Sequence, residues 1–265
     1  MIQLTYLAII PVIALLLFIY KKDKHPEPSS MLIKIFGLGC ATIIPAIIVE
    51  LIAEHAFAGL DRENLFILLI IVFLTVGIIE EFFKWLVIKV FCYNAEDFDE
   101  PYDAIVYAVF SSLGFACIEN ILYVLTSQHS FVTGILRAVT AIPGHACFGV
   151  IMGYYFSMAK LKKDQKENDM PYLIFSLAMP AFIHTLYDYF IMSGNGLLII
   201  IWVIFLIALF IISFILVWKV SKLEQQFQTK KNQKANKIEE KKYCTNCGAE
   251  CNTRFCSECG HKNQE

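Results

Sequence analysis

Seven long apolar stretches dominate this sequence, and each has about the length needed to cross a lipid bilayer as a helix. A spanning helix needs about 20 mostly apolar residues, because the hydrocarbon core is about 30 Å thick and each helical residue adds about 1.5 Å. Within lipid, a helix satisfies its backbone hydrogen bonds internally. We therefore predict an all-α polytopic membrane protein with about seven transmembrane helices, at residues 2–20, 31–57, 65–90, 103–125, 131–159, 171–192 and 197–217.

The composition supports a bilayer as the solvent for most of the chain. Apolar residues make up 57% of the sequence and charged residues 17%, whereas soluble domains average about 45–50% and about 25%. The net charge of −2 leaves no strongly basic surface, so no nucleic acid is expected as a partner. Residues 2–20 lack a basic segment before the apolar run and a small-residue cleavage site, and we interpret them as a retained first helix.

Lysines gather in three of the segments that follow the predicted spans. They come after the first, fifth and seventh spans: Lys21, Lys22 and Lys24; Lys160, Lys162, Lys163 and Lys166; Lys219 and Lys222. The loops on the opposite side hold one basic residue, Arg62. Because basic residues favour the cytoplasmic side, we expect a multi-pass cell-membrane protein with its N-terminus outside and its C-terminal tail in the cytoplasm.

The third predicted span carries the sequence Glu80-Glu81-Phe-Phe-Lys84 among apolar residues. An ionisable side chain at bilayer depth costs about 2.5–3.5 kcal/mol on insertion scales, so such residues usually face a cavity. Glu80 and Lys84 share a helix face, and Glu81 lies about 100° around the helix. Two interpretations stay open: Glu80 and Lys84 only neutralise each other near the inner end of the helix, or they belong to a site.

The next three spans each carry further ionisable side chains. Glu119 lies deep in the fourth span, with no basic residue within reach on that helix, and His145 of the fifth follows a Pro-Gly pair that could open the backbone. In the sixth span, His184 and Asp188 are one helical turn apart, so the carboxylate can hold one imidazole nitrogen and leave the other for a metal or a proton. Each residue alone is also compatible with a structural hydrogen bond.

Together, these groups favour one polar cavity enclosed by the third to sixth spans. Each group is costly in hydrocarbon unless it meets the others, and a bundle of the four helices removes that cost for all of them. Glutamate can act as a general base, and histidine can bind a metal or stabilise an oxyanion. We expect Glu50, Glu54 and His55, near the end of the second span, at the membrane interface and outside the site.

The ionisable residues stand in four motifs that occur in order on successive spans: Glu80-Glu81-x-x-Lys84; Phe115-x-x-x-Glu119-Asn120 after Tyr102-Asp103-x-Ile-Val-Tyr107; Arg137-x-x-Thr140 before Pro143-Gly-His145; and His184-x-x-x-Asp188. Together these motifs resemble the PrsW family of intramembrane proteases, a branch of the superfamily that includes the CAAX prenyl endopeptidases. The resemblance implies an endopeptidase that cleaves a membrane-anchored protein within or beside the bilayer. In PrsW-like proteins this regulated intramembrane proteolysis is linked to an anti-sigma factor in stress signalling.

The resemblance also implies a catalytic set on these four spans: Glu80, Glu81, Lys84, Glu119, His145, His184 and Asp188. In this set the two adjacent glutamates activate water, and the two histidines bind a metal or stabilise an oxyanion. Glu119 stands where the prenyl-endopeptidase relatives have a histidine, so their ligand set does not transfer directly. A metal-free glutamate mechanism remains open beside a catalytic zinc with an open position for water, held by Glu80, Glu119, His145 and His184.

The C-terminal tail contains two Cys-x-x-Cys-Gly knuckles. Four thiolates at this spacing form a closed tetrahedral zinc site, and the glycine after each second cysteine lets the backbone turn tightly. Because so short a segment cannot bury a core, the metal supplies its folding energy. We predict a structural zinc ribbon that docks a cytoplasmic protein, with Cys251 as a spare thiol and with the ligands Cys244, Cys247, Cys256 and Cys259.

The predicted domains are a transmembrane protease domain at 1–218, a charged linker, helical or disordered, at 219–242, and the zinc ribbon at 243–262. Two other classes of function compete with the protease. A proton- or ion-coupled transporter uses the same residue types in the membrane, but inverted repeats and paired broken helices are not evident in the sequence. A non-catalytic sensor or scaffold would act through the ribbon, although every motif position holds a chemically competent residue.

Overall fold

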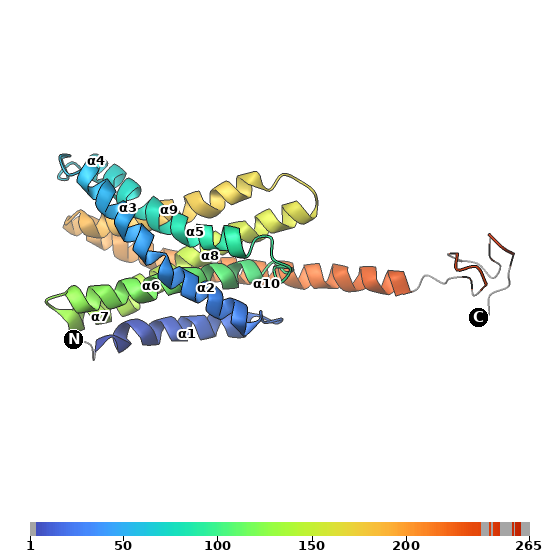
Figure 1. Ribbon diagram of the computed structural model, residues 1–265. Helices are drawn as coiled ribbons and strands as arrows, with labels where there is room; N and C mark the ends of the chain where they lie inside the picture. The colour runs from blue at the N-terminus through green and yellow to red at the C-terminus, as the bar shows by residue number, and fades with distance from the viewer. Residues whose placement is uncertain (1–3, 240–243, 245, 250–255, 257, 261–265) are drawn as a thin grey trace. The chain divides into compact units, whose positions relative to one another are not determined.

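The computed structural model describes all residues except 1–3, 240–243, 245, 250–255, 257 and 261–265. The chain divides into two compact units, Met1–Ser221 and Lys222–Glu265. The first unit is a bundle of helices (Figure 1). The second contains the end of the last helix and the cysteine-rich tail.

Helices are the only regular secondary structure among the described residues. One of them, η2, is a short π-helical segment between two α-helices. In chain order the elements are α1 (Tyr6–Lys22), α2 (Ser29–Ala41), α3 (Ile43–Ala56), α4 (Leu65–Val72), η2 (Phe73–Gly77), α5 (Ile78–Phe91), α6 (Asp103–Thr126), α7 (Ser130–Val139), α8 (Ala141–Asp164), α9 (Met170–Met192) and α10 (Gly196–Glu239).

Six helical segments are long and apolar enough to cross a membrane: Ser29–Ala56, Leu65–Phe91, Asp103–Thr126, Ser130–Asp164, Met170–Met192 and Gly196–Thr229. They correspond to the second to seventh predicted spans. The first predicted span corresponds to α1, whose 17 residues pack against α6, α7 and α8 in the same bundle. The prediction of an all-α polytopic membrane protein is therefore confirmed. Helix α10 continues past its span, so the predicted linker is helical as far as Glu239.

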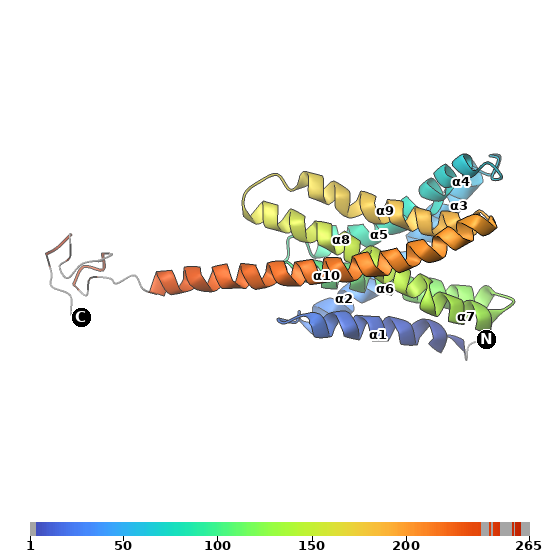
Figure 2. The ribbon, with the colours of Figure 1, turned by 180° about the vertical axis from the view of Figure 1, so that it is seen from behind.

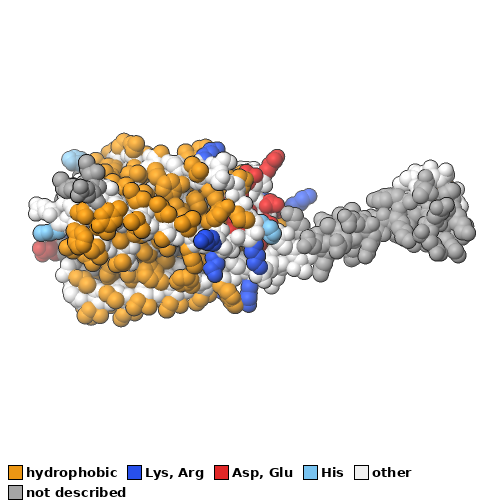
Figure 3. Space-filling model, turned by 90° about the horizontal axis from the view of Figure 1, so that it is seen from below, with side chains coloured by type: hydrophobic (Ala, Val, Ile, Leu, Met, Phe, Trp, Pro, Cys, Tyr) orange, Lys and Arg blue, Asp and Glu red, His pale blue; other side chains and the backbone are white. Residues whose placement is uncertain are grey.

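The loops of the bundle lie alternately at its two ends. The start of α1 and the loops α3–α4, α6–α7 and α9–α10 lie at one end, and the loops α1–α2, α5–α6 and α8–α9 lie at the other (Figure 1). Between the ends, apolar side chains cover the surface, and the visible charged side chains gather beyond this apolar belt (Figure 3). Exposed apolar residues such as Ile200, Ile204 and Phe214 would be unfavourable in water and are suited to contact with lipid.

Two of the predicted spans are broken by proline. A proline inside a helix donates no hydrogen bond to the carbonyl four residues earlier, and its ring clashes with that carbonyl. Helix α2 accordingly ends at Ala41, four residues before Pro45, and α7 ends at Val139, four residues before Pro143. The sequence suggested that Pro143-Gly144 opens the helix backbone, but the break lies at Thr140. Gly144 is inside α8, and its N–H donates to the Thr140 carbonyl at 2.8 Å.

Helix α6 forms the centre of the bundle. It is buried along most of its length and packs against α1, α2, α5, α7 and α8. On the opposite face of α8, the side chains Phe148, Tyr187 and Leu206 join α8, α9 and α10 in a second apolar cluster. Figure 2 shows α10 running along this side of the bundle beside α8 and α9.

Gly77, the last residue of η2, allows α9 to approach closely. A Cβ at this position would lie only 2.8 Å from the Ala181 carbonyl oxygen of α9 and would also overlap the Thr185 side chain. Such a distance is too short for a carbon–oxygen contact, so only glycine permits this packing. Because α5 begins at the next residue, the contact sets the position of Glu80 and Glu81 against α9.

An acidic cluster joins the α1–α2 loop to the start of α6. The Tyr107 hydroxyl donates to Glu27 Oε2 at 2.5 Å, and the Glu100 backbone N–H donates to Asp103 Oδ2 at 2.7 Å. His25 Nδ1 lies 3.1 Å from Glu100 Oε2. Burial raises the pKa of Glu27 to about 7, although the hydrogen bond from the tyrosine opposes the shift.

The glycine contact predicts that Gly77→Ala destabilises the protein by about 1–3 kcal/mol, because the added methyl overpacks the α9 interface. The matched control is Gly37→Ala on α2, where a Cβ meets nothing within 4 Å. The control should be neutral or gain up to about 1 kcal/mol from helix propensity. Thermal unfolding of both variants in detergent measures the difference, and equal stability would contradict the close approach.

The acidic cluster predicts a pH dependence of stability. The pKa of Glu27 is about 7 in the folded state and 4.5 without the fold, so the folded state binds the extra proton between these values. The contribution to stability is full below about pH 4.5 and is lost as the pH rises through about 7. We expect Glu27→Gln to flatten the fall in melting temperature between pH 5 and 7.5. An unchanged pH profile would show that Glu27 does not carry the effect.

Candidate active site

The structure brings the seven predicted catalytic residues together. Three are on α5, one is on α6, one on α8 and two on α9, and all lie inside predicted spans. Glu81 and Lys84 have no exposed surface, and Glu80, His145 and His184 are at most 5% exposed. The residues are Glu80, Glu81, Lys84, Glu119, His145, His184 and Asp188. They form one continuous network of hydrogen bonds and ion pairs.

Lys84 occupies the centre of this network. Its Nζ lies 3.0 Å from Glu80 Oε2, 2.8 Å from Glu81 Oε1 and 3.1 Å from His145 Nδ1. An ammonium has three donors, and three acceptors surround this one. The Phe115 ring lies 4.3 Å from the nitrogen and adds a cation–π contact. Lys84 and Glu80 are therefore not a self-contained pair, because the same ammonium also contacts Glu81 and a second helix.

His184 is held between two carboxylates. Its Nδ1 lies 2.9 Å from Glu81 Oε1, and its Nε2 lies 3.2 Å from Asp188 Oδ2. The ring also stacks on Phe148, with 4.6 Å between ring centroids and an interplanar angle of 26°. These contacts fix the orientation of the imidazole and leave little freedom for rotation.

Glu119 holds His145 from the side opposite Lys84. Glu119 Oε2 lies 2.8 Å from His145 Nε2, and its other oxygen accepts from Arg137 Nη2 at 2.9 Å. Arg137 also donates from Nε to Asn120 Oδ1 at 2.6 Å and lies over the Tyr123 ring. Both imidazoles thus have one nitrogen facing the centre of the network and the other bound to a carboxylate.

Arg137 is the site residue that the predicted catalytic set omitted. Glu119 has no basic partner on its own helix, as expected, but α7 supplies one. The signal was present in the sequence, because an arginine within an apolar span needs an acidic partner as much as Glu119 needs a basic one. Only the break at Thr140, which separates α7 from α8, brings the two side chains together.

A cavity of about 670 Å³ opens onto the network. Its polar wall includes side chains from α5, α6, α8 and α9: Glu80, Glu119, His145, His184 and Asp188. Apolar residues of α9 and α10, among them Ile191, Ile199 and Trp202, form another part of the wall. Lys84 and Glu81 do not line this cavity and lie behind its wall. The volume is in the range of sites that bind drug-sized ligands.

Four of these residues could hold a metal ion. One donor atom of each residue lies within 4.8 Å of the donor atoms of the other three. These residues are Glu80, Glu81, His145 and His184. Two imidazoles and two carboxylates are ligands that zinc accepts. Among the described residues, Glu81 Oε2 is a buried oxygen without a hydrogen-bond partner, which further fits a donor set able to take a cation. Glu119, in the predicted ligand set, instead contacts the outward nitrogen of His145.

The C-terminal unit holds a second group of metal-ligand type. The Sγ atoms of Cys244, Cys247, Cys256 and Cys259 all lie within 4.8 Å of one another, with Cys244–Cys259 and Cys247–Cys256 at 3.5 Å. Zinc–sulfur bonds of about 2.3 Å place tetrahedral sulfurs about 3.8 Å apart. These four cysteines can therefore hold zinc. Cys251 lies outside the described residues.

Both knuckles turn at glycine, as the spacing predicts. Gly248 and Gly260 have φ values of 72° and 70°, a region that side chains strongly disfavour. The Gly248 N–H donates to the Cys244 carbonyl at 2.9 Å, and the Gly260 N–H donates to the Cys256 carbonyl at 2.8 Å. Each turn thereby brings the two cysteines of its knuckle to the same side.

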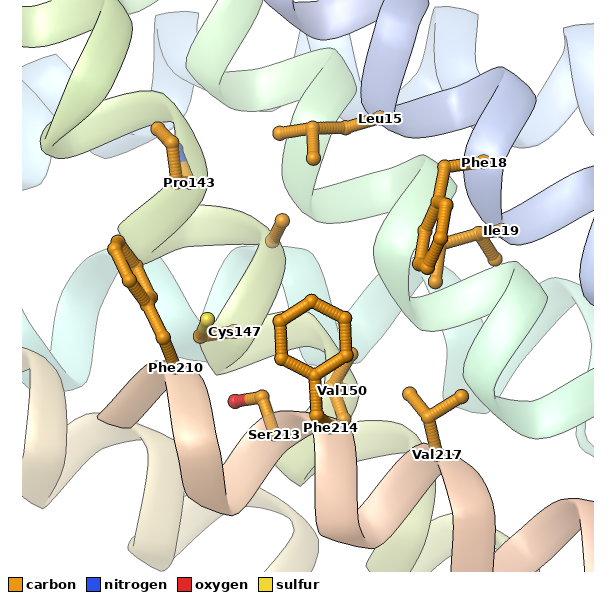
Figure 4. A pocket seen from close by; sticks show the side chains of 11 residues that line it. Leu15, Phe18, Ile19, Pro143, Cys147, Val150, Phe210, Ser213, Phe214 and Val217 are labelled. Carbon is orange, nitrogen blue, oxygen red and sulfur yellow. The ribbon is translucent and has the colours of Figure 1, made fainter. Parts of the chain in front are cut away.

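A smaller cavity of about 170 Å³ lies between α1, α8 and α10. Side chains such as Phe18, Cys147 and Phe214 surround it (Figure 4). Its lining holds no carboxylate, ammonium or imidazole.

A helical membrane bundle with buried carboxylates and imidazoles around a cavity is the arrangement expected of an intramembrane hydrolase. The comparisons identify the family. Residues 27–217 match the model of the PrsW family intramembrane metalloprotease. The chain therefore belongs to the PrsW family of intramembrane proteases, and the expected resemblance is confirmed.

Relatives in several bacteria support the same conclusion. Protease PrsW of Oceanobacillus iheyensis is 37% identical over 213 residues, which cover 80% of this chain and 94% of the relative. Protease PrsW of Bacillus subtilis is 36% identical over 184 residues, 68% of this chain and 79% of the relative. Protease PrsW of Clostridioides difficile is 32% identical over 230 residues, 84% and 91%. No solved structure gave a significant match.

The two donor sets predict how much zinc the full chain binds. We expect about two ions per chain, one in each set. Replacing both Cys244 and Cys256 with serine should leave about one ion, and adding His184→Ala should remove it. The control is Cys251→Ser, which should retain both. Elemental analysis of purified protein gives the stoichiometry, and loss of all zinc in the double cysteine variant would indicate a metal-free membrane site.

Proposed function

We propose that this protease cleaves a membrane-anchored protein within or beside the bilayer, with Glu80 and Glu81 in the activation of water. The observation that carries the proposal is the cavity whose wall includes Glu80, His145 and His184. In this arrangement a peptide bond in the cavity lies beside a carboxylate base and two imidazoles. The surrounding helices exclude bulk water and lipid, which strengthens every electrostatic interaction inside.

Glu80 is the general base in this mechanism, because it lines the cavity while Glu81 lies behind it. Glu80 accepts a proton from water as the water oxygen bonds to the peptide carbon. The proton then passes to the peptide nitrogen as the carbon–nitrogen bond breaks, so that one water is consumed for each bond cleaved. His145 and His184 stabilise the oxyanion that forms in between or bind a metal.

The remaining residues orient these groups. Asp188 and Glu119 each hold the outward nitrogen of one imidazole. Lys84 pairs with both Glu80 and Glu81 and keeps them in place. Zinc bound by Glu80, Glu81, His145 and His184 would lower the pKa of a water molecule and polarise the peptide carbonyl.

The substrate is a membrane protein whose cleaved segment is apolar, since α9 and α10 contribute apolar side chains to the cavity. The cavity lies near one end of the bundle, because Glu119 is about two turns from the end of α6 and His184 about two turns from the end of α9. The lysine distribution supports an orientation with this end outside the cell and the zinc ribbon in the cytoplasm. The resemblance to PrsW-like proteins favours an anti-sigma factor as the substrate and a cytoplasmic protein as the ribbon's partner.

The mechanism predicts that Glu80→Gln lowers cleavage by at least about 100-fold, the usual effect of losing acid–base catalysis. Glu81→Gln should also lower it, because Glu81 holds Lys84 and His184 in place. Reconstituted protein is incubated with solubilised membrane proteins, and mass spectrometry identifies new peptide N-termini. The matched control is Glu54→Gln, since Glu54 is half-exposed and pairs with Arg62 away from the site. Undiminished cleavage by both glutamine variants would rule out this mechanism.

A further inference from the structure

A second cavity, of about 270 Å³, meets the first one at the catalytic carboxylates. It lies on the side of α3, and Val76, Glu80, Glu119 and Tyr123 line both cavities. Its other lining residues come from α3 and the outer part of α6: Ile43, Ile47, Glu50, Leu122 and Thr126. Glu80 and Glu119 therefore border both cavities.

Glu50 is the polar side chain that α3 presents to this cavity. The sequence places it near the end of a span and suggests an interface role, but the structure turns it toward Glu80 and Glu119. Its Oε1 is buried, and no described residue gives it a hydrogen bond. A buried oxygen of this kind is rare in proteins unless water satisfies it.

The cavity is suited to water. Its volume of about 270 Å³ is far above the roughly 10–15 Å³ that one water needs, and three carboxylates provide hydrogen-bond acceptors. At one end is Thr126, the exposed last residue of α6. At the other end is Glu80, which is 5% exposed. The cavity thus connects the end of the helix bundle with the buried catalytic base.

A separate route for water matters once substrate is bound. Hydrolysis consumes one water for each peptide bond, and a peptide in the larger cavity blocks the approach to Glu80 from that side. We propose that the α3-side cavity delivers this water and that Glu50 is a positioning residue that holds it by hydrogen bonds. This role rests on the proposed function, in which Glu80 activates the water. Glu50 touches no reacting atom and exchanges no proton with the substrate.

Thiol labelling tests the route without any need for cleavage. Ile47→Cys places a thiol in the cavity, and Ile48→Cys places one on the apolar surface, where Ile48 is 55% exposed. A charged, water-soluble methanethiosulfonate reacts with thiolates, which form in water and not in lipid. We expect the cavity thiol to react at least about tenfold faster, as measured by mass spectrometry of the labelled peptide. Thr126→Cys at the mouth serves as the positive control.

The role of Glu50 is tested in the same background. Glu50→Leu should slow labelling of Ile47→Cys by about tenfold, because thiolate formation needs the water that the leucine expels. Glu50→Gln, which still bonds to water, should restore it. With a substrate identified, Glu50→Leu should lower kcat by about tenfold at an unchanged KM, and Glu50→Gln should recover the rate.

Equal labelling of Ile47→Cys and Ile48→Cys overturns the water route, and labelling that does not respond to Glu50→Leu overturns the role of Glu50. If Glu50→Leu does not fold, the comparison of Ile47→Cys with Ile48→Cys in the otherwise native chain still decides the route. If labelling follows the expectation while no protein is cleaved, the cavity stands and the proposed function fails. The two failures are thereby distinguishable.

Discussion

The buried ammonium of Lys84 is the interaction on which the rest of the site depends. A charge without exposed surface in the hydrocarbon region costs several kcal/mol unless it is paired and fully hydrogen-bonded. Lys84 meets this requirement with two carboxylates of its own helix and an imidazole of α8. Glu81 extends the network to α9 through His184, and His145 extends it to α6 through Glu119. Neutralising one cation therefore ties four helices together.

A helix break and a close helix contact position the side chains of this network. Pro143 ends α7 at Val139, and the resulting break lets Arg137 and His145 reach Glu119 from different sides. Gly77 brings η2 against α9, so that the first turn of α5 lies within hydrogen-bonding distance of His184. The two residues act differently. The proline interrupts a helix, and the glycine lets two helices approach because it has no side chain.

The two cavities differ in their walls and both reach Glu80. The larger one has apolar side chains from α9 and α10, and the smaller one lies on the side of α3. In the function proposed above, the larger cavity would admit the apolar substrate segment, and the smaller one would admit water to the same carboxylate.

The sequence by itself determined the membrane spans, because the thickness of the bilayer fixes how long an apolar run must be. It also determined that the ionisable groups of four spans converge, because each is too costly in lipid alone, and that four cysteines can gather around zinc. Only the tertiary structure decided that Arg137 pairs with Glu119 and that Glu50 faces the site. It also decided that Glu81 lies among the possible metal ligands, whereas Glu119 contacts the outward nitrogen of His145. These contacts depend on how far each helix is rotated and where it is broken relative to its neighbours, and packing across the whole bundle sets both.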